Sequence, residues 1–177
     1  LRFTSPNGTP MRIGVIADTH DNVAAVEAAV SIFEDASADA LVHCGDYIAP
    51  PVIPSFEGHE VHGVLGNNDG ELDGLEAAFR TLGAGSELHG RFADLEFDGA
   101  RFAVLHGEDR DRVDELAASG EYDYVCYGHH HEREKRAVGE TTVLNPGAHF
   151  PTVPGEHRTV AVVDLDGDDV TFERVEP

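Results

Sequence analysis

The sequence predicts a single α/β domain with additional antiparallel strands in its C-terminal half. Three observations support this fold class. The length of 177 residues corresponds to about one domain. Short apolar runs alternate with amphipathic segments from Met11 onwards. No repeat or linker interrupts the pattern, so we expect residues 1–10 to be a loose leader and residues 11–177 to form one domain.

Short apolar runs mark the expected strands. Each run is rich in aliphatic or aromatic residues, as is typical of strands that are mostly buried. The expected strands are Ile13–Ala17, Ala40–Cys44, Val61–Leu65, Arg101–Leu105 and Tyr124–Tyr127.

Apolar residues recur at helical spacing in three segments between these runs. The first segment has Asp21 or Asn22 available as its N-cap. Its apolar face consists of Val23, Val26, Val30 and Phe33. The second has Gly83 where a C-terminal cap is expected. Its apolar face consists of Leu72, Leu75, Phe79 and Leu82. The third runs from Asp109 to Ser119, with acidic residues in its first turn.

The C-terminal half is predicted to be richer in strands. Apolar residues alternate in Arg91–Phe97, and Val143–Leu144 ends one arm of an expected hairpin. Arg158–Leu165 and Val170–Val175 flank the turn signal Asp166-Gly167-Asp168 and predict a second hairpin.

The net charge is far from zero. Asp and Glu number 34 against 12 Lys and Arg, which gives a formal charge of −22. Self-repulsion of this size destabilises a compact state, but salt near 1 M shortens the screening length to roughly 3 Å. We therefore expect a protein adapted to a salt-rich cytoplasm, with an ordinary acidic protein as the alternative.

The same composition excludes some partners. Duplex nucleic acid requires clustered Lys and Arg, which this chain lacks. No apolar run approaches the ~18 residues of a membrane helix, and the N-terminus lacks a secretory-signal pattern. Cys44 and Cys126 lie in apolar runs and are expected to be buried free thiols in a reducing compartment.

Residues that commonly bind metal follow five of the expected strands. In chain order the motifs are Asp18-Thr19-His20, Gly45-Asp46, Gly66-Asn67-Asn68-Asp69, His106-Gly107 and Gly128-His129-His130-His131. Because the carboxyl ends of strands in an open α/β sheet converge on one crevice, we expect these motifs to meet. One such motif is weak evidence, but five in order at strand ends are strong evidence.

The motifs supply seven nitrogen and oxygen donors: Asp18, His20, Asp46, Asn67, His106, His129 and His131. Clustering two carboxylates without a cation would be costly, so the set predicts two divalent metal ions that share one carboxylate. Imidazole and carboxylate ligands suit Mn, Fe, Zn or Ni, and the lack of a cysteine ligand argues against structural zinc.

The ordered series Asp-x-His, Gly-Asp, Gly-Asn, His-Gly and Gly-His-x-His resembles the signature of the calcineurin-like metallophosphoesterase superfamily. Asn145-Pro146-Gly147 resembles a loop of its small, single-domain phosphodiesterase subgroup. The resemblance spans roughly Met11 to Gly147 plus the terminal strands. It implies a four-layer αββα sandwich, in which helices flank two mixed β-sheets.

The resemblance also implies roles for individual residues. The first ion would be held by Asp18, His20 and His131. The second would be held by Asn67, His106 and His129. Asp46 would bridge the two ions, and the candidate catalytic residues are Asp46, His20 and Asn68.

Two positions depart from the superfamily pattern. Asn68 stands where a His usually protonates the leaving group, and an amide cannot act as a general acid at neutral pH. Glu108 stands where the fourth motif often has a second His. The metal-binding set is therefore complete, whereas the accessory acid is in doubt.

Residues beside the motifs have less specific expectations. Asp69 and Glu108 could orient a ligand imidazole. His130 should face away from the site, and His149 could contact a substrate phosphate. His43 is expected to be packed or hydrogen-bonded within a strand.

The sequence thus predicts a dinuclear metal-dependent phosphoesterase, most consistent with a phosphodiesterase that uses a metal-activated hydroxide on a small phosphate ester. Manganese is the expected metal, with Ni, Fe and Zn as alternatives. The competing hypotheses are a phosphomonoesterase or nucleotide phosphatase, a protein-binding scaffold like the retromer subunit of this superfamily, and a single-strand nuclease. Homo-oligomerisation stays open, and we expect a cytoplasmic location.

Overall fold

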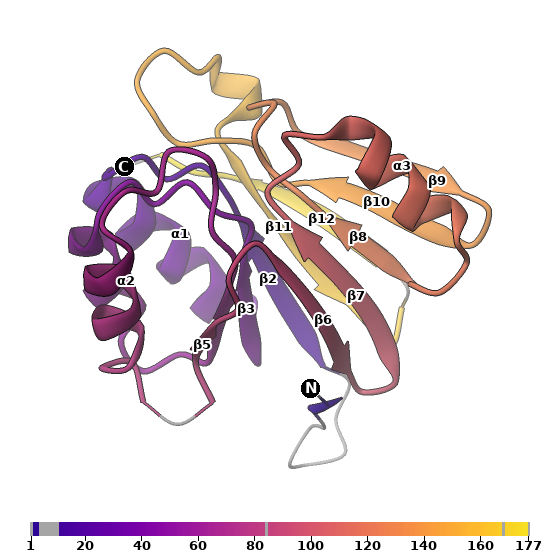
Figure 1. Ribbon diagram of the computed structural model, residues 1–177, viewed down its shortest axis with the longest axis horizontal. Coiled ribbons are helices and arrows are strands. Elements are labelled where there is room, and N and C mark those ends of the chain that lie inside the picture. The colour runs from indigo at the N-terminus through magenta and orange to yellow at the C-terminus, as the bar shows by residue number, and fades with distance from the viewer. Residues whose placement is uncertain (1, 4–10, 84, 168, 177) are drawn as a thin grey trace.

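Two six-stranded sheets lie face to face in the computed structural model, which describes residues 2–3, 11–83, 85–167 and 169–176 (Figure 1). The first sheet has the order β12 (Asp169–Arg174), β11 (Thr159–Asp164), β2 (Arg12–Ile16), β3 (Ala40–His43), β4 (Val61–Gly63) and β5 (Glu87–Leu88). Strands β2 to β5 pair in parallel, while β11 is antiparallel to both β2 and β12.

The second sheet is also mixed. Its order is β1 (Arg2–Phe3), β6 (Phe92–Phe97), β7 (Ala100–Leu105), β8 (Tyr124–Cys126), β10 (Thr141–Asn145) and β9 (Glu134–Val138). Strands β7, β8 and β10 pair in parallel, whereas β6 pairs antiparallel with β7 and β9 pairs antiparallel with β10.

Helices cover the outer face of each sheet (Figure 1). Elements α1 (Val23–Asp35), η1 (Pro50–Phe56) and α2 (Leu72–Phe79) pack on the first sheet, and α3 (Arg110–Ala118) packs on the second. A short 3-10 turn, η2 (Gly155–His157), precedes β11. The arrangement confirms the four-layer αββα sandwich that the sequence predicts.

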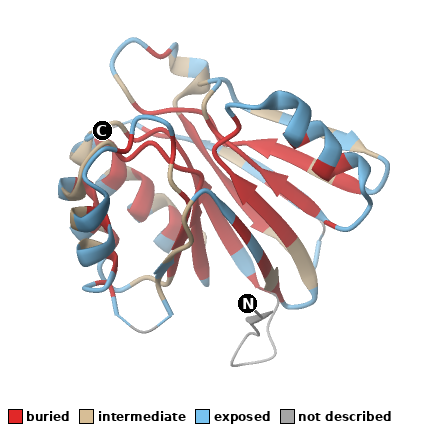
Figure 2. Ribbon diagram, in the orientation of Figure 1, coloured by how far each residue is buried: buried red, intermediate tan, exposed pale blue. Residues whose placement is uncertain are grey.

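The strands near the middle of the molecule are buried on both faces (Figure 2). In β2, Val15 faces the core between the sheets, whereas Ile16 faces the core under α1. In β7, Val104 and Ala103 divide in the same way between the inner core and the core under α3. Burial on both faces explains why these strands read as continuous apolar runs.

The helix boundaries follow their capping residues. The side chain of Asn22 accepts a hydrogen bond from the Ala25 N–H at the start of α1, and Asp109 accepts one from Arg112 N–H at the start of α3. Of the two caps predicted for α1, Asn22 is therefore the one used. Helix α2 ends at Phe79, before the predicted Leu82, and Gly83 follows with φ 106°.

Some elements were not predicted. Strand β5 and segment η2 are short and lack a clear apolar pattern, and η1 is a proline-rich apolar segment without helical or strand periodicity. The hairpin expected at Val143–Leu144 is present as β9 and β10, although the polar residues of β9 itself were not singled out. In the expected loose leader, Arg2–Phe3 instead forms β1 and pairs in parallel with β6, while residues 4–10 lie outside the described residues. The predicted C-terminal hairpin is present as β11 and β12, although Asp168 of its turn is not described. Among the described residues, the helices are too short or too polar to cross a membrane.

Candidate metal centre

The carboxyl ends of five parallel strands from both sheets meet at one edge of the sandwich. Neighbouring strands β2, β3 and β4 of the first sheet lead into the loops that carry Asp18, Asp46 and Asn67. Neighbouring strands β7 and β8 of the second sheet lead to His106 and His129. This convergence is typical of ligand sites in α/β folds.

Two fully buried carboxylates, Asp18 and Asp46, form the centre of the site. Asp46 faces one imidazole on each side: Oδ2 lies 3.4 Å from His20 Nε2, and Oδ1 lies 3.4 Å from His106 Nε2. Asp18 Oδ1 lies 3.4 Å from His131 Nε2. Two groups of three side chains are close enough to hold an ion: Asp18, His20 and His131, and Asp18, Asp46 and His106.

His129 and Asn67 lie beside the second of these groups. His129 Nδ1 is 2.9 Å from Asn67 Oδ1, and the ring centroids of His129 and His106 are 5.2 Å apart. The backbone N–H of His129 donates to Asp18 Oδ2 at 2.9 Å. The structure therefore brings all seven predicted donors into one connected cluster.

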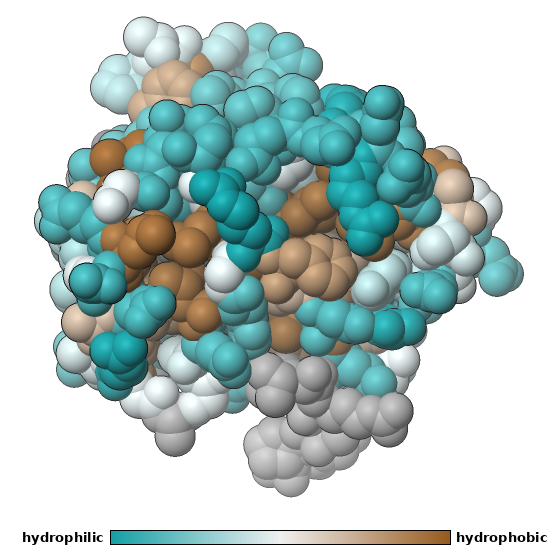
Figure 3. All heavy atoms as spheres, viewed as in Figure 1, coloured by the Kyte–Doolittle hydropathy of each residue, from teal (hydrophilic) through white to brown (hydrophobic). Residues whose placement is uncertain are grey.

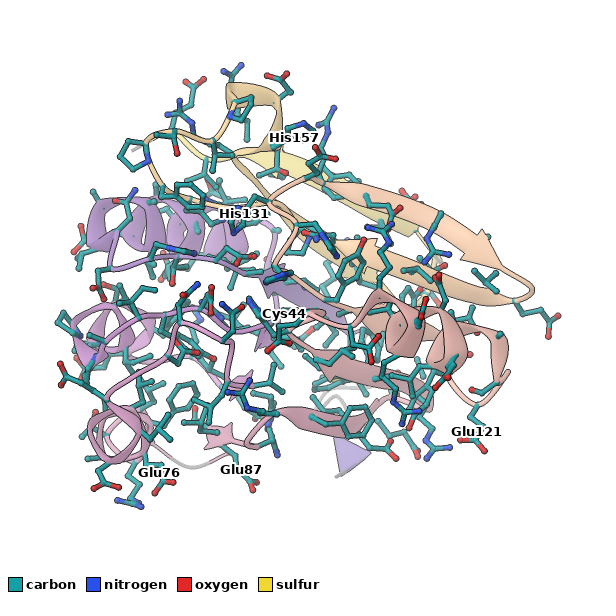
Figure 4. The ribbon with its side chains drawn as sticks, turned by 45° about the horizontal axis from the view of Figure 1, so that its top comes forward. Cys44, Glu76, Glu87, Glu121, His131 and His157 are labelled. Atoms are coloured by element: carbon teal, nitrogen blue, oxygen red, sulfur yellow. The ribbon has the colours of Figure 1, made fainter. Side chains whose placement is uncertain are left out.

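A backbone carbonyl fixes the orientation of His106. Its Nδ1 lies 2.8 Å from the carbonyl oxygen of Cys44, to which it donates. The lone pair of the neutral ring is then on Nε2, which points to the two carboxylates. This arrangement is typical of metal-binding histidines, whose second nitrogen is held by a carbonyl or carboxylate. Figure 4 labels Cys44, which follows β3 of the first sheet, and His131, which lies in the loop after β8 of the second sheet.

The backbone of the site is strained. Five donor-bearing residues have positive φ, a conformation that residues with a Cβ rarely adopt. They are Asp18 (52°), His20 (43°), Asp46 (60°), His129 (65°) and His131 (58°). Backbone hydrogen bonds between the loops hold this conformation, including Asp18 N–H to the Gly45 carbonyl and His20 N–H to the Asp46 carbonyl. The side chains are thereby directed toward one another rather than along the strands.

Asp69 and Asn68 stabilise the loop that carries Asp46. The Asp69 carboxylate accepts hydrogen bonds from the backbone N–H groups of Asp46, Ile48 and Gly66. The Asn68 amide donates to Asp46 Oδ2 at 2.7 Å, and its backbone N–H donates to Oδ1 at 2.9 Å. Asp69 therefore orients loop backbone and not, as one prediction had it, a ligand imidazole.

Glycine is required at two positions because the carboxylates approach the backbone closely. A Cβ on Gly66 would lie 2.1 Å from Asp46 Oδ1, and one on Gly128 would lie 2.5 Å from Asp18 Oδ2. Both contacts are far inside van der Waals distance, so the glycines of these two motifs make room for the carboxylates.

The charges of the cluster shift the pKa values of its members. The carboxylates of Asp18 and Asp46 raise the pKa of His20 to about 9. Burial raises the pKa of Asp46, but the facing His106 and His20 outweigh it and hold that pKa well below its ordinary value. Burial lowers the pKa of His106, and Asp46 and Asp18 outweigh it, so the net shift is upward. The carboxylates thus attract positive charge, and a divalent cation would compete with these protons.

Unpartnered buried atoms indicate that a cation fits here. In the described part of the chain, Asp18 Oδ1, His20 Nε2 and His106 Nε2 are buried without a hydrogen-bond partner. Buried polar atoms are rarely without a hydrogen-bond partner. Here Asp18 Oδ1 lies 3.8 Å from His20 Nε2 and 3.9 Å from His106 Nε2. The donor set, two carboxylates with imidazoles, matches the preferences of first-row divalent metals.

The remaining histidines and acids beside the motifs have structural roles. Buried His43 accepts from the Gly45 N–H and contacts Thr19 Oγ1 at 3.2 Å, so it links the first two motif loops. Glu108 pairs with Arg91 at the surface instead of orienting an imidazole. His149 is only 2% exposed, and its contact with a substrate phosphate stays a prediction.

Sequence reasoning missed Phe150. Its ring centroid lies 4.6 Å from that of His20 and 4.7 Å from that of His131, and the side chain is partly exposed. No sequence motif singles out this residue, because its place depends on the path of the loop after β10.

A two-sheet sandwich whose strand ends carry this donor set defines a metal-dependent phosphoesterase architecture. The family model of the calcineurin-like phosphoesterase superfamily domain matches residues 11–168. The chain therefore belongs to this superfamily, as the motifs predict. Membership identifies it as a hydrolase of phosphate esters and implies divalent metal ions as cofactors.

Individual relatives support the assignment. The chain is 34% identical over 139 residues to the phosphodiesterase MJ0936 of Methanocaldococcus jannaschii, covering 77% of this chain and 83% of the relative. It is 30% identical over 172 residues to a probable metallophosphoesterase of Methanothermobacter thermautotrophicus, covering 92% of this chain and 91% of the relative. A solved structure described as a novel archaeal phosphodiesterase superposes with a TM-score of 0.84 at 30% identity, covering 93% of this chain and 99% of that one.

Proposed function

We propose that this protein is a phosphodiesterase that hydrolyses small phosphate diesters with two divalent metal ions. The observation that carries the proposal is the placement of Asp46, whose two oxygens each face an imidazole of a different group at 3.4 Å. A carboxylate in this position suits a bridge between two ions. The named phosphodiesterases among its relatives support the choice of diesters.

The proposed ligand sets follow the two sides of Asp46. The first ion would be held by Asp18, His20 and His131. The second would be held by Asn67, His106 and His129. Manganese is the proposed metal, with Ni, Fe and Zn as alternatives that the same donors accept. When bound, such ions lower the pKa of water and stabilise the anionic oxygens of the transition state.

The chain's own residues set the limits of this chemistry. Asn68, in the place of the usual acid, donates its amide hydrogen to Asp46 Oδ2. It therefore positions the carboxylate and has no proton to give to a leaving group. We propose that His20 and Asp46 act at the reacting centre and that leaving groups must depart unprotonated, as aryloxides do.

The test is hydrolysis of bis(p-nitrophenyl) phosphate by purified protein supplied with Mn²⁺, with p-nitrophenyl phosphate as the monoester comparison. We expect a higher kcat/KM for the diester and loss of activity after chelation. A higher kcat/KM for the monoester would replace the proposal with a phosphomonoesterase. Bound metal without turnover of either ester would favour a protein-binding scaffold.

We further propose that the protein works in a salt-rich cytoplasm, without duplex nucleic acid as a partner. The net charge of −22 supports this, and hydrophilic residues cover most of the face seen in Figure 3. Screening of these carboxylates should raise the melting temperature between low and multimolar KCl. A melting temperature independent of salt would contradict the proposal. Light scattering on the same samples would detect any homo-oligomer.

A further inference from the structure

A pocket adjoins the metal centre on the side of the second sheet. It lies between the loop after β8 and the loop after β10, which carry His131 and His157 (Figure 4). Its volume is about 280 Å³. His131 lines this pocket and also directs its Nε2 to Asp18 at 3.4 Å, so the pocket begins at the metal centre.

Several flat rings line this pocket. Phe150 packs against His20 and His131 on its inner side and lines the pocket as well. His130 and His157 supply two further rings. An aromatic group on a substrate could stack on such a surface while its phosphate is held at the metal centre.

The polar atoms of the pocket suit an uncharged group with hydrogen-bonding edges. His157 Nδ1 accepts from the Arg133 backbone N–H at 3.3 Å, so the proton of the neutral ring is on Nε2 and available to an acceptor. The Thr152 hydroxyl is a second polar group in the wall. Glu132, also in the wall, disfavours an additional anion at this position.

We infer that this pocket binds a planar, uncharged aromatic group of nucleobase size on the ester group that the reaction does not displace. This inference rests on the proposed phosphodiesterase function and specifies its substrate class, a nucleoside-type diester. Phe150 is the specificity-determining residue, because its ring joins the pocket to the metal centre.

The kinetic test keeps the leaving group constant and varies the retained group. Thymidine 5′-(p-nitrophenyl phosphate) and methyl p-nitrophenyl phosphate both release p-nitrophenol. For the wild type with Mn²⁺, we expect a KM about tenfold lower for the thymidine ester. Phe150→Leu, which keeps an apolar side chain but removes the flat ring, should bring the KM ratio of the two esters near one, and Phe150→Tyr should restore it.

A control variant comes from an exposed apolar side chain on another element. Leu72 in α2 is 46% exposed, and Leu72→Ala should keep the wild-type KM ratio. Equal KM values for both esters in the wild type, or an unchanged ratio in Phe150→Leu, would overturn the inference.

Saturation-transfer NMR with thymidine separates this inference from the proposed function, because it requires no turnover. We expect transfer to the base protons with the wild type and with Leu72→Ala, and a loss with Phe150→Leu. If neither ester is hydrolysed but thymidine receives saturation, the pocket stands and the phosphodiesterase proposal fails. If thymidine receives none from the wild type, the pocket inference fails whatever the activity.

Discussion

The two sheets contribute different parts of the candidate metal centre. The first sheet supplies both carboxylates, Asp18 and Asp46, which are completely buried. The second supplies His106, His129 and His131, of which the His106 side chain is fully buried and the His131 side chain is 36% exposed. We refer to these two parts as the carboxylate floor and the histidine wall.

The two parts are also held in different ways. The floor is fixed by several hydrogen bonds, including three to the Asp69 carboxylate and two from Asn68 to Asp46. The exposed part of the histidine wall has fewer hydrogen bonds: the His129 side chain contacts Asn67, and that of His131 contacts Phe150. In the proposed dinuclear centre, the carboxylate floor would therefore set the spacing of the ions, and the exposed part of the histidine wall would leave room for substrate.

The largest expected effect is that of removing the charge at the centre of the floor. Asp46→Asn should lower kcat/KM for a diester by about a thousandfold or more, because a neutral amide cannot bridge two cations. His131→Ala, in the wall, should cost less. The measurement is steady-state kinetics at saturating Mn²⁺, with circular dichroism to verify folding. Equal losses in the two variants would contradict the division into floor and wall.

A smaller effect is expected from the support of the floor. Asp69→Asn keeps the shape of the side chain but weakens its acceptance of three backbone N–H groups, so Mn²⁺ affinity should fall roughly 10- to 100-fold. Glu108→Gln is the matched control, because Glu108 lies two residues after His106 in the sequence but pairs with Arg91 at the surface. Titration calorimetry should show wild-type affinity for this control, and a similar loss in both variants would argue against a specific role of Asp69.

Acid should destabilise the metal-free protein through His43 and His149, two buried histidines that are not among the proposed metal ligands. Burial lowers the pKa of His43 to about 3 and that of His149 to about 4, from an ordinary value of 6.5. A lowered histidine pKa contributes stability above pH 6.5, and this contribution is lost as the pH falls toward 4 because the unfolded chain binds the extra proton.

In this interval, each ring should contribute at most about 1.4 kcal/mol per pH unit to the dependence of the free energy of unfolding on pH. His149→Leu should remove one such contribution. The substitution breaks no hydrogen bond of the ring, because both ring nitrogens lack a partner in the described structure. Urea unfolding between pH 4 and 6.5 measures the slope, and an unchanged slope in His149→Leu would be inconsistent with a neutral buried ring.

The smallest expected effect of a substitution is a change in leaving-group preference at Asn68. The wild type should cleave aryl diesters much faster than alkyl diesters, because Asn68 cannot act as an acid. Asn68→His should narrow this gap, although it also removes the amide hydrogen bond to Asp46. The measurement is the ratio of the hydrolysis rates of diesters with p-nitrophenyl and methyl leaving groups, in the wild type and in Asn68→His. An equal ratio in both proteins would show that the missing acid does not cause the preference for aryl diesters.

Much of the fold was predictable because the inner strands are buried on both faces and the helices carry regular apolar stripes. Strands such as β2 and β3 and the capped helices α1 and α3 lie close to their predicted positions. The short strand β5 and the polar strand β9 lack such patterns and are formed by pairing with neighbouring strands.

The candidate donors were predictable because each follows a recognisable strand, and the structure places them in one cluster. The role of Asp69 was not, because its acceptance of N–H groups from two loops depends on how those loops meet. Phe150 was not predictable for the same reason. Its ring reaches His20 across more than a hundred positions of sequence, through a loop that has no marked pattern.

The most direct test of the account is a calorimetric titration of metal-free protein with Mn²⁺, performed on the wild type and on Asp46→Asn. We predict two ions per chain for the wild type and weakened binding of both in the variant, because one carboxylate faces both groups of ligands. Uptake of one ion or none by the wild type would contradict the account.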